Sequence, residues 1–109
     1  MPLTRNFKDT VQARARRDAE FRKALLAEAA ECLLADEMET GKSLLRDYIN
    51  AVEGFGQLGR SIKHDPKSLM RMLGPAGNPR ASNLLEIIAH LQEREGVHLR
   101  VTAAMAGAD

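Results

Sequence analysis

Cysteine, tryptophan and long apolar runs are scarce or missing in this sequence of 109 residues. The single cysteine, Cys32, excludes an intrachain disulfide and a cysteine-rich zinc site, which fits a reducing compartment. No apolar run is long enough to cross a membrane, and the charges of Arg5, Lys8 and Asp9 interrupt any signal-peptide core. We therefore expect a cytoplasmic protein without a membrane segment.

Residue groups that would support catalysis are also missing. His64, His90 and His98 are not spaced to place two imidazole rings on one helical face, so a histidine metal site is not expected. The chain contains no phosphate-binding loop, no nucleophile elbow and no Cys-x-x-Cys pair. The sequence therefore predicts a protein that is not an enzyme and that binds no metal and no cofactor.

What the sequence does contain is enough apolar material for one small domain, with 44% hydrophobic and 28% charged residues. The net charge of +1 conceals a strong asymmetry between segments. Residues 1–23 carry seven Lys or Arg against three Asp or Glu, and residues 60–80 carry five against one, so each segment has a charge of +4. Residues 28–53 carry two against seven, a charge of −5. This pattern favours a polyanion or an acidic partner at the basic segments.

Helix signals cover most of the chain. Apolar residues recur at three- and four-residue steps in one segment that Asp18 can cap and in another that Asp36 can cap and Gly54 can end. Asp65 and Pro66 mark the start of a short helix, because Asp accepts the free amides of a first turn and Pro lacks an amide proton. Five helices are expected, over about residues 18–33, 36–53, 56–62, 65–73 and 80–96.

The hydrophobic period changes near the end of the chain. Val97, Leu99 and Val101 alternate with His98 and Arg100, which is the two-residue repeat of a strand with one buried face. No other segment offers a partner strand, so we expect a second copy or a different protein to pair with it. The expected organisation is a basic N-terminal arm at residues 1–17, a single helical domain at 18–102 and a flexible tail at 103–109.

Two of the short helices have the spacing of a helix-turn-helix at about residues 56–73. Leu58 and Leu69 lie eleven residues apart, and Gly59 supplies the small residue needed where two steeply crossing helices meet. The second helix would then present Lys67 and Arg71 outward beside its dipole-positive N-terminus. Bases and phosphates of a major groove offer the acceptors and the charge that such a face binds.

Residues 54–101 resemble the Cro- and lambda-repressor-like helix-turn-helix domain. The run SLMRMLGPAGNP, followed by a leucine-rich helix and a terminal strand, is similar to the addiction-module antidote (antitoxin) proteins of bacteria. The resemblance implies a mainly α, five-helix lambda-repressor-like domain with a short C-terminal β-strand. It also implies a protein that binds double-stranded DNA at its own promoter and pairs with a small ribonuclease-type toxin, which would be basic because it acts on RNA. The unpartnered strand at Val97, Leu99 and Val101 predicts in addition that the protein is a homodimer.

The sequence departs from the family pattern at two positions of the turn. Lys63 stands where glycine is usual, and His64 stands where a small aliphatic residue is usual. A lysine in the left-handed conformation that such a turn requires would cost about 1 kcal/mol. These departures put in question whether DNA is bound in the ordinary pose.

Charge and hydrogen-bonding capacity select the candidate DNA contacts. Arg71 is favoured because a guanidinium matches guanine bidentately, whereas Lys67 serves equally well as a solvated surface residue. Asn78 is at least as good a turn former as a phosphate contact. The predicted DNA-binding residues are Gln57, Lys63, His64, Lys67, Ser68, Arg71, Asn78 and Arg80.

The acidic helices give a second candidate surface. Glu31, Glu37, Glu39 and Asp47 are predicted to be exposed and to bind the basic toxin, although ordinary helix-surface solvation explains them nearly as well. Two function classes stay open. One is a sequence-specific DNA-binding transcriptional regulator, the antitoxin of a toxin–antitoxin pair. The other is a protein-interaction module whose helix-turn-helix is a scaffold and binds no DNA.

Overall fold

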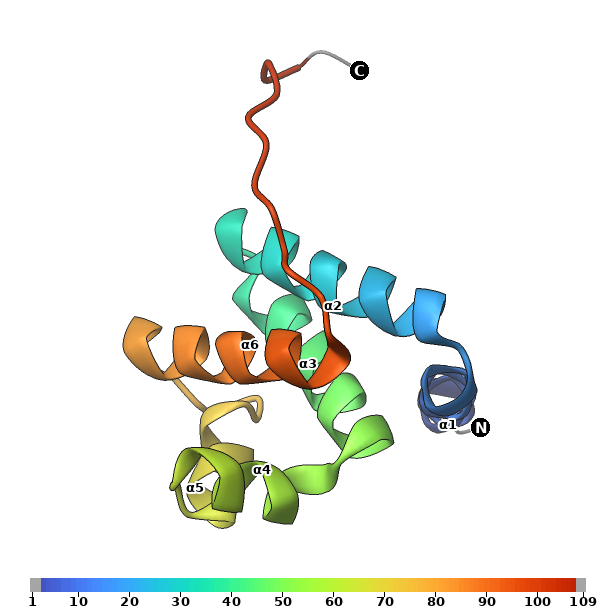
Figure 1. Ribbon diagram of the computed structural model, residues 1–109, viewed down its shortest axis with the longest axis vertical. Helices are drawn as coiled ribbons and strands as arrows, with labels where there is room; N and C mark the ends of the chain where they lie inside the picture. The colour runs from blue at the N-terminus through green and yellow to red at the C-terminus, as the bar shows by residue number, and fades with distance from the viewer. Residues whose placement is uncertain (1–2, 108–109) are drawn as a thin grey trace.

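Six α-helices account for most of residues 3–107, the part of the chain that the computed structural model describes (Figure 1). They are α1 (Leu3–Arg17), α2 (Ala19–Leu34), α3 (Met38–Val52), α4 (Gly54–Ile62), α5 (Pro66–Met72) and α6 (Ala81–Glu95). The prediction of a mainly α fold is confirmed. The prediction of five helices with a C-terminal strand is wrong, because residues 3–17 are helical and residues 97–101 pair with no strand in this range.

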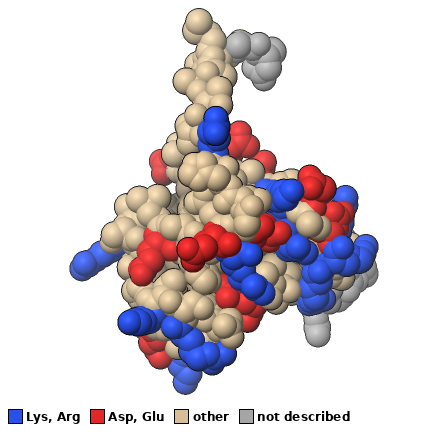
Figure 2. Space-filling model, viewed as in Figure 1, with Lys and Arg blue, Asp and Glu red and all other residues tan. Residues whose placement is uncertain are grey.

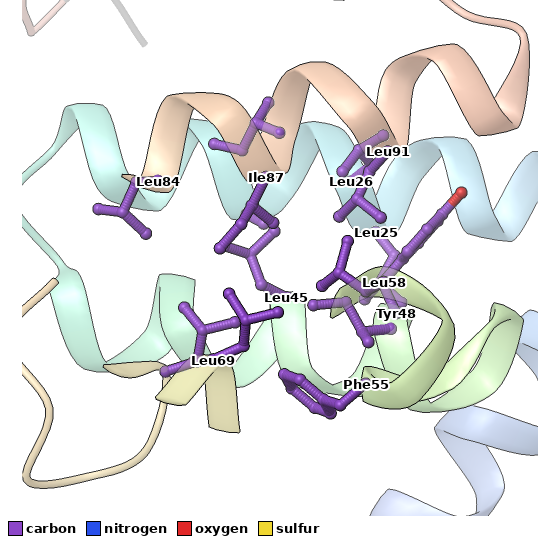
Figure 3. Close-up of a cluster of buried hydrophobic side chains, with 14 of the residues drawn as sticks. Leu25, Leu26, Leu45, Tyr48, Phe55, Leu58, Leu69, Leu84, Ile87 and Leu91 are labelled. Atoms are coloured by element: carbon purple, nitrogen blue, oxygen red, sulfur yellow. The ribbon is translucent and has the colours of Figure 1, made fainter. Parts of the chain in front are cut away.

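Leucine and isoleucine side chains from five of these helices meet at the centre (Figure 3). Leu26 of α2, Leu45 of α3 and Leu58 of α4 are each at most 1% exposed. Leu69 of α5 and Ile87 of α6 are fully buried with them. Burial of one such side chain contributes about 1.5–3 kcal/mol, so this shared core holds α4 and α5 firmly against the rest of the protein.

The expected N-terminal arm is a helix that packs on the domain. Ala15 of α1 is completely buried, and Val11 packs against the core from the same face. Arg22 of α2 donates from Nη1 to the Ala15 carbonyl oxygen at 2.9 Å. Residues 1–2 of the expected arm and residues 108–109 of the expected tail lie outside the described residues.

Two aspartates expected to cap helices behave differently. Asp18 caps α2 as predicted, because its side chain accepts from the Phe21 amide at 3.1 Å, and that hydrogen bond lowers the pKa of Asp18. The predicted cap at Asp36 is wrong, since Asp36 adopts a left-handed conformation with φ of 62°. The Glu37 amide then donates to the Cys32 carbonyl at 2.8 Å, so Asp36 helps to close α2 and Glu37 takes the N-cap position of α3.

A largely buried polar network joins α2, α3 and α6 near the end of α6. The Glu95 carboxylate, whose side chain is 6% exposed, accepts from Arg22 Nε at 2.9 Å and from the Tyr48 hydroxyl. Burial raises the pKa of Glu95, but the hydrogen bonds from Arg22 and Tyr48 outweigh it, so the pKa is lowered overall. Burial and the adjacent carboxylate raise the pKa of Tyr48. The network therefore holds Glu95 ionised between an arginine and a neutral tyrosine.

The predicted strand keeps its alternating burial without forming a ladder. Val97 and Leu99 are half-buried against the core, whereas His98 and Arg100 are exposed. The sequence pattern thus identified Val97 and Leu99 correctly as inward-facing, but the predicted burial of Val101 is wrong, because Val101 is exposed. Beyond residue 99 the chain leaves the helices and projects from the molecule (Figure 1).

Candidate nucleic-acid interface

The pair of helices α4 and α5 meets closely at Gly59. A Cβ atom at this position would lie 2.6 Å from the His64 carbonyl oxygen and 2.9 Å from Pro66 Cγ, so no larger residue fits without movement of a helix. The His64 amide donates to the Gly59 carbonyl at 3.0 Å and closes the turn. These contacts support the predicted role of Gly59, which permits the approach of α5 to α4.

Lys63 occupies the left-handed turn between the two helices, with φ of 60° and ψ of 47°. The turn therefore keeps the left-handed conformation although its residue is lysine and not glycine. Because glycine adopts this conformation without steric cost, Lys63→Gly should raise the free energy of unfolding by about 1 kcal/mol. Urea denaturation followed by circular dichroism measures the change. Lys63→Ala, which removes the long side chain but keeps the strain, is the matched control, and an equal gain in both variants would contradict the explanation.

The start of α5 is fixed by Asp65. Its carboxylate oxygen Oδ2 accepts from the Ser68 amide at 3.1 Å and from the Ser68 hydroxyl at 3.3 Å, while Pro66 occupies the first turn. This confirms the predicted cap. Ser68 is therefore first of all a part of the helix start, because its hydroxyl hydrogen is already donated to Asp65.

The end of α5 is held by two cationic side chains of α3. Lys42 is fully buried, and its Nζ donates to the carbonyl oxygens of Gly74 at 2.8 Å and Gly77 at 2.7 Å. Glu39 lies 3.0 Å from the same Nζ, so all three ammonium hydrogens have an acceptor. Arg46 donates from Nη1 to the Leu73 carbonyl oxygen. The loop after α5 is thus tied to α3, a role of Lys42 and Arg46 that no local sequence pattern indicated.

The same loop folds back closely onto the last turn of α5. A Cβ atom at Gly77 would lie 2.3 Å from the Arg71 carbonyl oxygen and 2.4 Å from that of Met72. Together with Lys42, this contact places Asn78 beside α5. Ser68, Arg71 and Asn78 line one shallow depression of about 390 Å³.

The predicted DNA-binding residues fall into separate groups. Lys67 and Arg71 are exposed on α5, and neither forms an ion pair with another residue in the range 3–107. Arg80 is exposed at the N-cap of α6, and Gln57 is exposed on α4, where it accepts from Arg60 at 3.1 Å. Lys and Arg side chains gather at the end of the molecule where α4 and α5 lie (Figure 2).

The second group, Lys63 and His64, lies beside carboxylates of α6. His64 Nε2 is 2.9 Å from Glu86 Oε1, and its side chain is 29% exposed. Lys63 lines a hollow of about 420 Å³ together with Glu86 and Glu93. Figure 2 shows acidic side chains in a band across the region of α6. The structure therefore separates Lys63 and His64 from Lys67 and Arg71 and places them where nearby negative charge opposes a phosphate.

The acidic surface predicted from the sequence lies where α2 meets α3. Glu31, Glu37 and Glu39 are exposed there, as predicted. Leu34, the last residue of α2, is 71% exposed and gives the same corner an apolar centre. The predicted exposure of Asp47 is wrong, because Asp47 is 6% exposed on the inner side of α3. The apolar residues of α3 recur every three to four positions, and this pattern predicts which side of the helix is buried. It does not show whether a residue at the edge of that side, such as Asp47, faces solvent or faces α1.

The function of these surfaces has to be inferred from their own geometry, because comparisons with protein-family models, with curated proteins and with solved structures give no match. Among residues 3–107, no helix combines the length and the apolar character needed to span a membrane. In the same range, no three His, Cys, Asp or Glu side chains come together as a metal site.

Proposed function

We propose that this protein is a sequence-specific DNA-binding regulator that inserts α5 into a major groove. The observation that carries the proposal is the exposed cationic face of α5, where Lys67 and Arg71 extend from a helix whose two ends are both anchored. Anchoring matters because a base contact discriminates only if its donor is held in place. A dimer would present two such helices to half-sites about 34 Å apart.

The nature of the two cations gives each a distinct role. Arg71 offers a planar fork that pairs with O6 and N7 of guanine, so it reads a base edge. Lys67 is a flexible point charge near the start of α5, and it suits a phosphate contact. Asn78 borders the depression next to Arg71 and is suited to add a contact to the DNA backbone. Ser68 borders the same depression, but its hydroxyl would have to leave Asp65 before it could donate to a phosphate.

The corresponding test compares two alanine variants on the DNA upstream of the protein's own reading frame. Arg71→Ala should weaken binding to the specific site by about 1–3 kcal/mol and relax the preference at one base position. Lys67→Ala should weaken binding to all sequences alike. It should also reduce the slope of the logarithm of the binding constant against the logarithm of salt concentration by about 1, the amount expected for one lost phosphate contact. Gel-shift titrations over several salt concentrations measure both effects.

A variant outside the proposed surface provides the control. Glu93→Ala removes an exposed charge on α6 and should leave the sequence preference unchanged. The DNA-binding proposal is contradicted if wild-type protein retards no band at low salt. It is also contradicted if Arg71→Ala and Glu93→Ala bind the upstream DNA as tightly as the wild type.

We propose further that the regulator is the antitoxin of a toxin–antitoxin pair, with the corner between α2 and α3 as the toxin-binding surface. The corner supports this role because an exposed leucine, Leu34, lines one hollow with Glu31, and the exposed Glu37 follows three residues later in the chain. Apolar contact can hold a partner there, and the carboxylates attract a basic one. If DNA is not bound, the same corner supports the alternative of a protein-interaction module.

Exchange of Glu31, Glu37 and Glu39 for glutamine tests the corner. The association rate with the proposed toxin, a small basic protein expected from the adjacent reading frame, should fall about tenfold at low salt and less than about twofold at high salt, because exposed charges steer encounter. Stopped-flow or surface-plasmon measurements give the rates. An equal change of charge at the exposed Glu20, Glu86 and Glu93 is the matched control. Equal rates for both triple variants would leave the corner as ordinary solvated surface.

A further inference from the structure

The segment after α6 carries an unused hydrogen-bonding edge. The Val97 amide donates to the Gln92 carbonyl oxygen at 3.0 Å, and the Leu99 amide donates to Gln92 Oε1 at 2.8 Å. Both donors therefore point toward α6. Along an extended chain successive amides point in opposite directions, so the amides of His98 and Arg100 point away from α6. Neither of these two amides has a hydrogen-bond partner in the described part of the chain.

Apolar side chains on this segment are also left without cover. Val101 is 79% exposed and Met105 is 82% exposed, although Val101 continues the alternation of the half-buried Val97 and Leu99. A hollow of about 620 Å³ runs between residues 99–102 and the second half of α2, where Ala27, Ala30 and Leu34 line it. The edge is thus accessible, apolar on one face and bordered by open space.

We propose that a second copy of this chain pairs with this backbone edge, through antiparallel alignment of residues 97–101 of both copies about a two-fold axis at Leu99. The pairing places Leu99 opposite Leu99 of the second copy and Val97 opposite its Val101. The amide of His98 then donates to the carbonyl oxygen of Arg100 in the second copy, and the amide of Arg100 donates to that of His98. This inference specifies the dimer in the proposed function, and it does not depend on DNA binding.

Charge and side-chain pattern select this register over its nearest rival. A two-fold axis at Arg100 would use the same free amides, but it would set two arginines directly opposite each other, which destabilises an antiparallel pair. The axis at Leu99 instead places Arg100 opposite His98, and the exposed Val101 finds an apolar neighbour in Val97. The register with its axis at Leu99 is therefore favoured over the register with its axis at Arg100.

Cysteine cross-linking without DNA distinguishes the two registers. In a Cys32→Ala background, Leu99→Cys should form a disulfide-linked dimer readily, because a non-hydrogen-bonded pair places its Cα atoms about 4.5 Å apart. Arg100→Cys should cross-link at least about fivefold less, since the diagonal separation of about 7–8 Å exceeds the span of a disulfide. Preferential or equal cross-linking of Arg100→Cys, or none from either variant, overturns the proposal.

A second pair of variants tests the backbone edge. Arg100→Pro removes the amide that points outward, whereas Arg100→Ala removes only the side chain. Sedimentation equilibrium without DNA should show that Arg100→Pro raises the dimer dissociation constant at least about tenfold and that Arg100→Ala changes it less than about threefold. Equal dissociation constants for the two variants, or a monomeric wild type at micromolar concentration, overturn the pairing. Either result leaves the DNA-binding face of α5 to be judged by the gel shifts above.

Discussion

Lys42→Met is expected to lower the free energy of unfolding by about 2–4 kcal/mol. Methionine fills nearly the same volume, so the loss comes from the hydrogen bonds and not from a cavity. The Gly77 carbonyl oxygen would lose its 2.7 Å donor, and the Gly74 carbonyl would lose one of its two. Urea denaturation followed by circular dichroism is the suitable measurement, because the chain has no tryptophan to report by fluorescence.

The exposed partner of Lys42 provides the control. Glu39→Gln weakens the ion pair but leaves both carbonyl hydrogen bonds in place, and the Glu39 side chain is 66% exposed. Its effect should therefore stay below about 1 kcal/mol. If Lys42→Met proved as stable as Glu39→Gln, the carbonyl contacts would not be what holds the loop after α5.

Gly59→Ala is expected to cost about 2–3 kcal/mol, because overpacking at a helix crossing forces the backbones apart. The new Cβ would stand 2.6 Å from a backbone oxygen, which cannot rotate away as a flexible side chain can. The variant should also bind DNA more weakly than its fraction of folded protein accounts for, since α5 has to shift relative to α4. Thermal unfolding and gel-shift titration of the same preparation separate the two effects.

Gly56 offers the same substitution in the same helix with the opposite expected sign. The nearest atom to a Cβ at Gly56 is Arg60 Nη1 at 3.9 Å, so alanine fits without contact strain. Gly56→Ala should raise the free energy of unfolding by about 0.5–1 kcal/mol, because alanine loses less backbone entropy in a helix. A loss of stability in both variants would show that the effect at Gly59 is not specific to the crossing.

Local sequence signals predicted the helices that have strong caps. Asp18 and Asp65 each accept from the amide three residues later, so a short-range rule was sufficient to place α2 and α5. The N-terminal helix was not foreseen, because its basic charge suggested an arm. A four-residue apolar spacing is nevertheless present at Leu3, Phe7, Val11 and Ala15. The charged residues of a helix lie on its solvent side, so they do not show whether its other side packs against the protein.

The candidate site was predicted in part, and the missing parts are long-range. Lys67 and Arg71 were found because they lie on the outer face of a short helix with a clear start. Lys42 was not found, since a lysine is ordinarily assigned to the surface, although it falls in the apolar stripe between Met38 and Leu45. Its acceptors in the loop after α5 are more than thirty residues away, at separations of 32 and 35. No local pattern encodes such a pairing.

The central claim, that α5 is the DNA-binding surface, is tested most directly by titration of ¹⁵N-labelled protein with the duplex upstream of its own reading frame. We expect amide shifts to concentrate at Lys67, Ser68 and Arg71 of α5 and at Asn78 of the loop that follows, with small changes elsewhere. The other basic surface, at Arg14, Arg16 and Arg17 of α1, is the internal comparison. Shifts that concentrate on α1 or on the corner of α2 and α3, or no shifts at low salt, would contradict the claim.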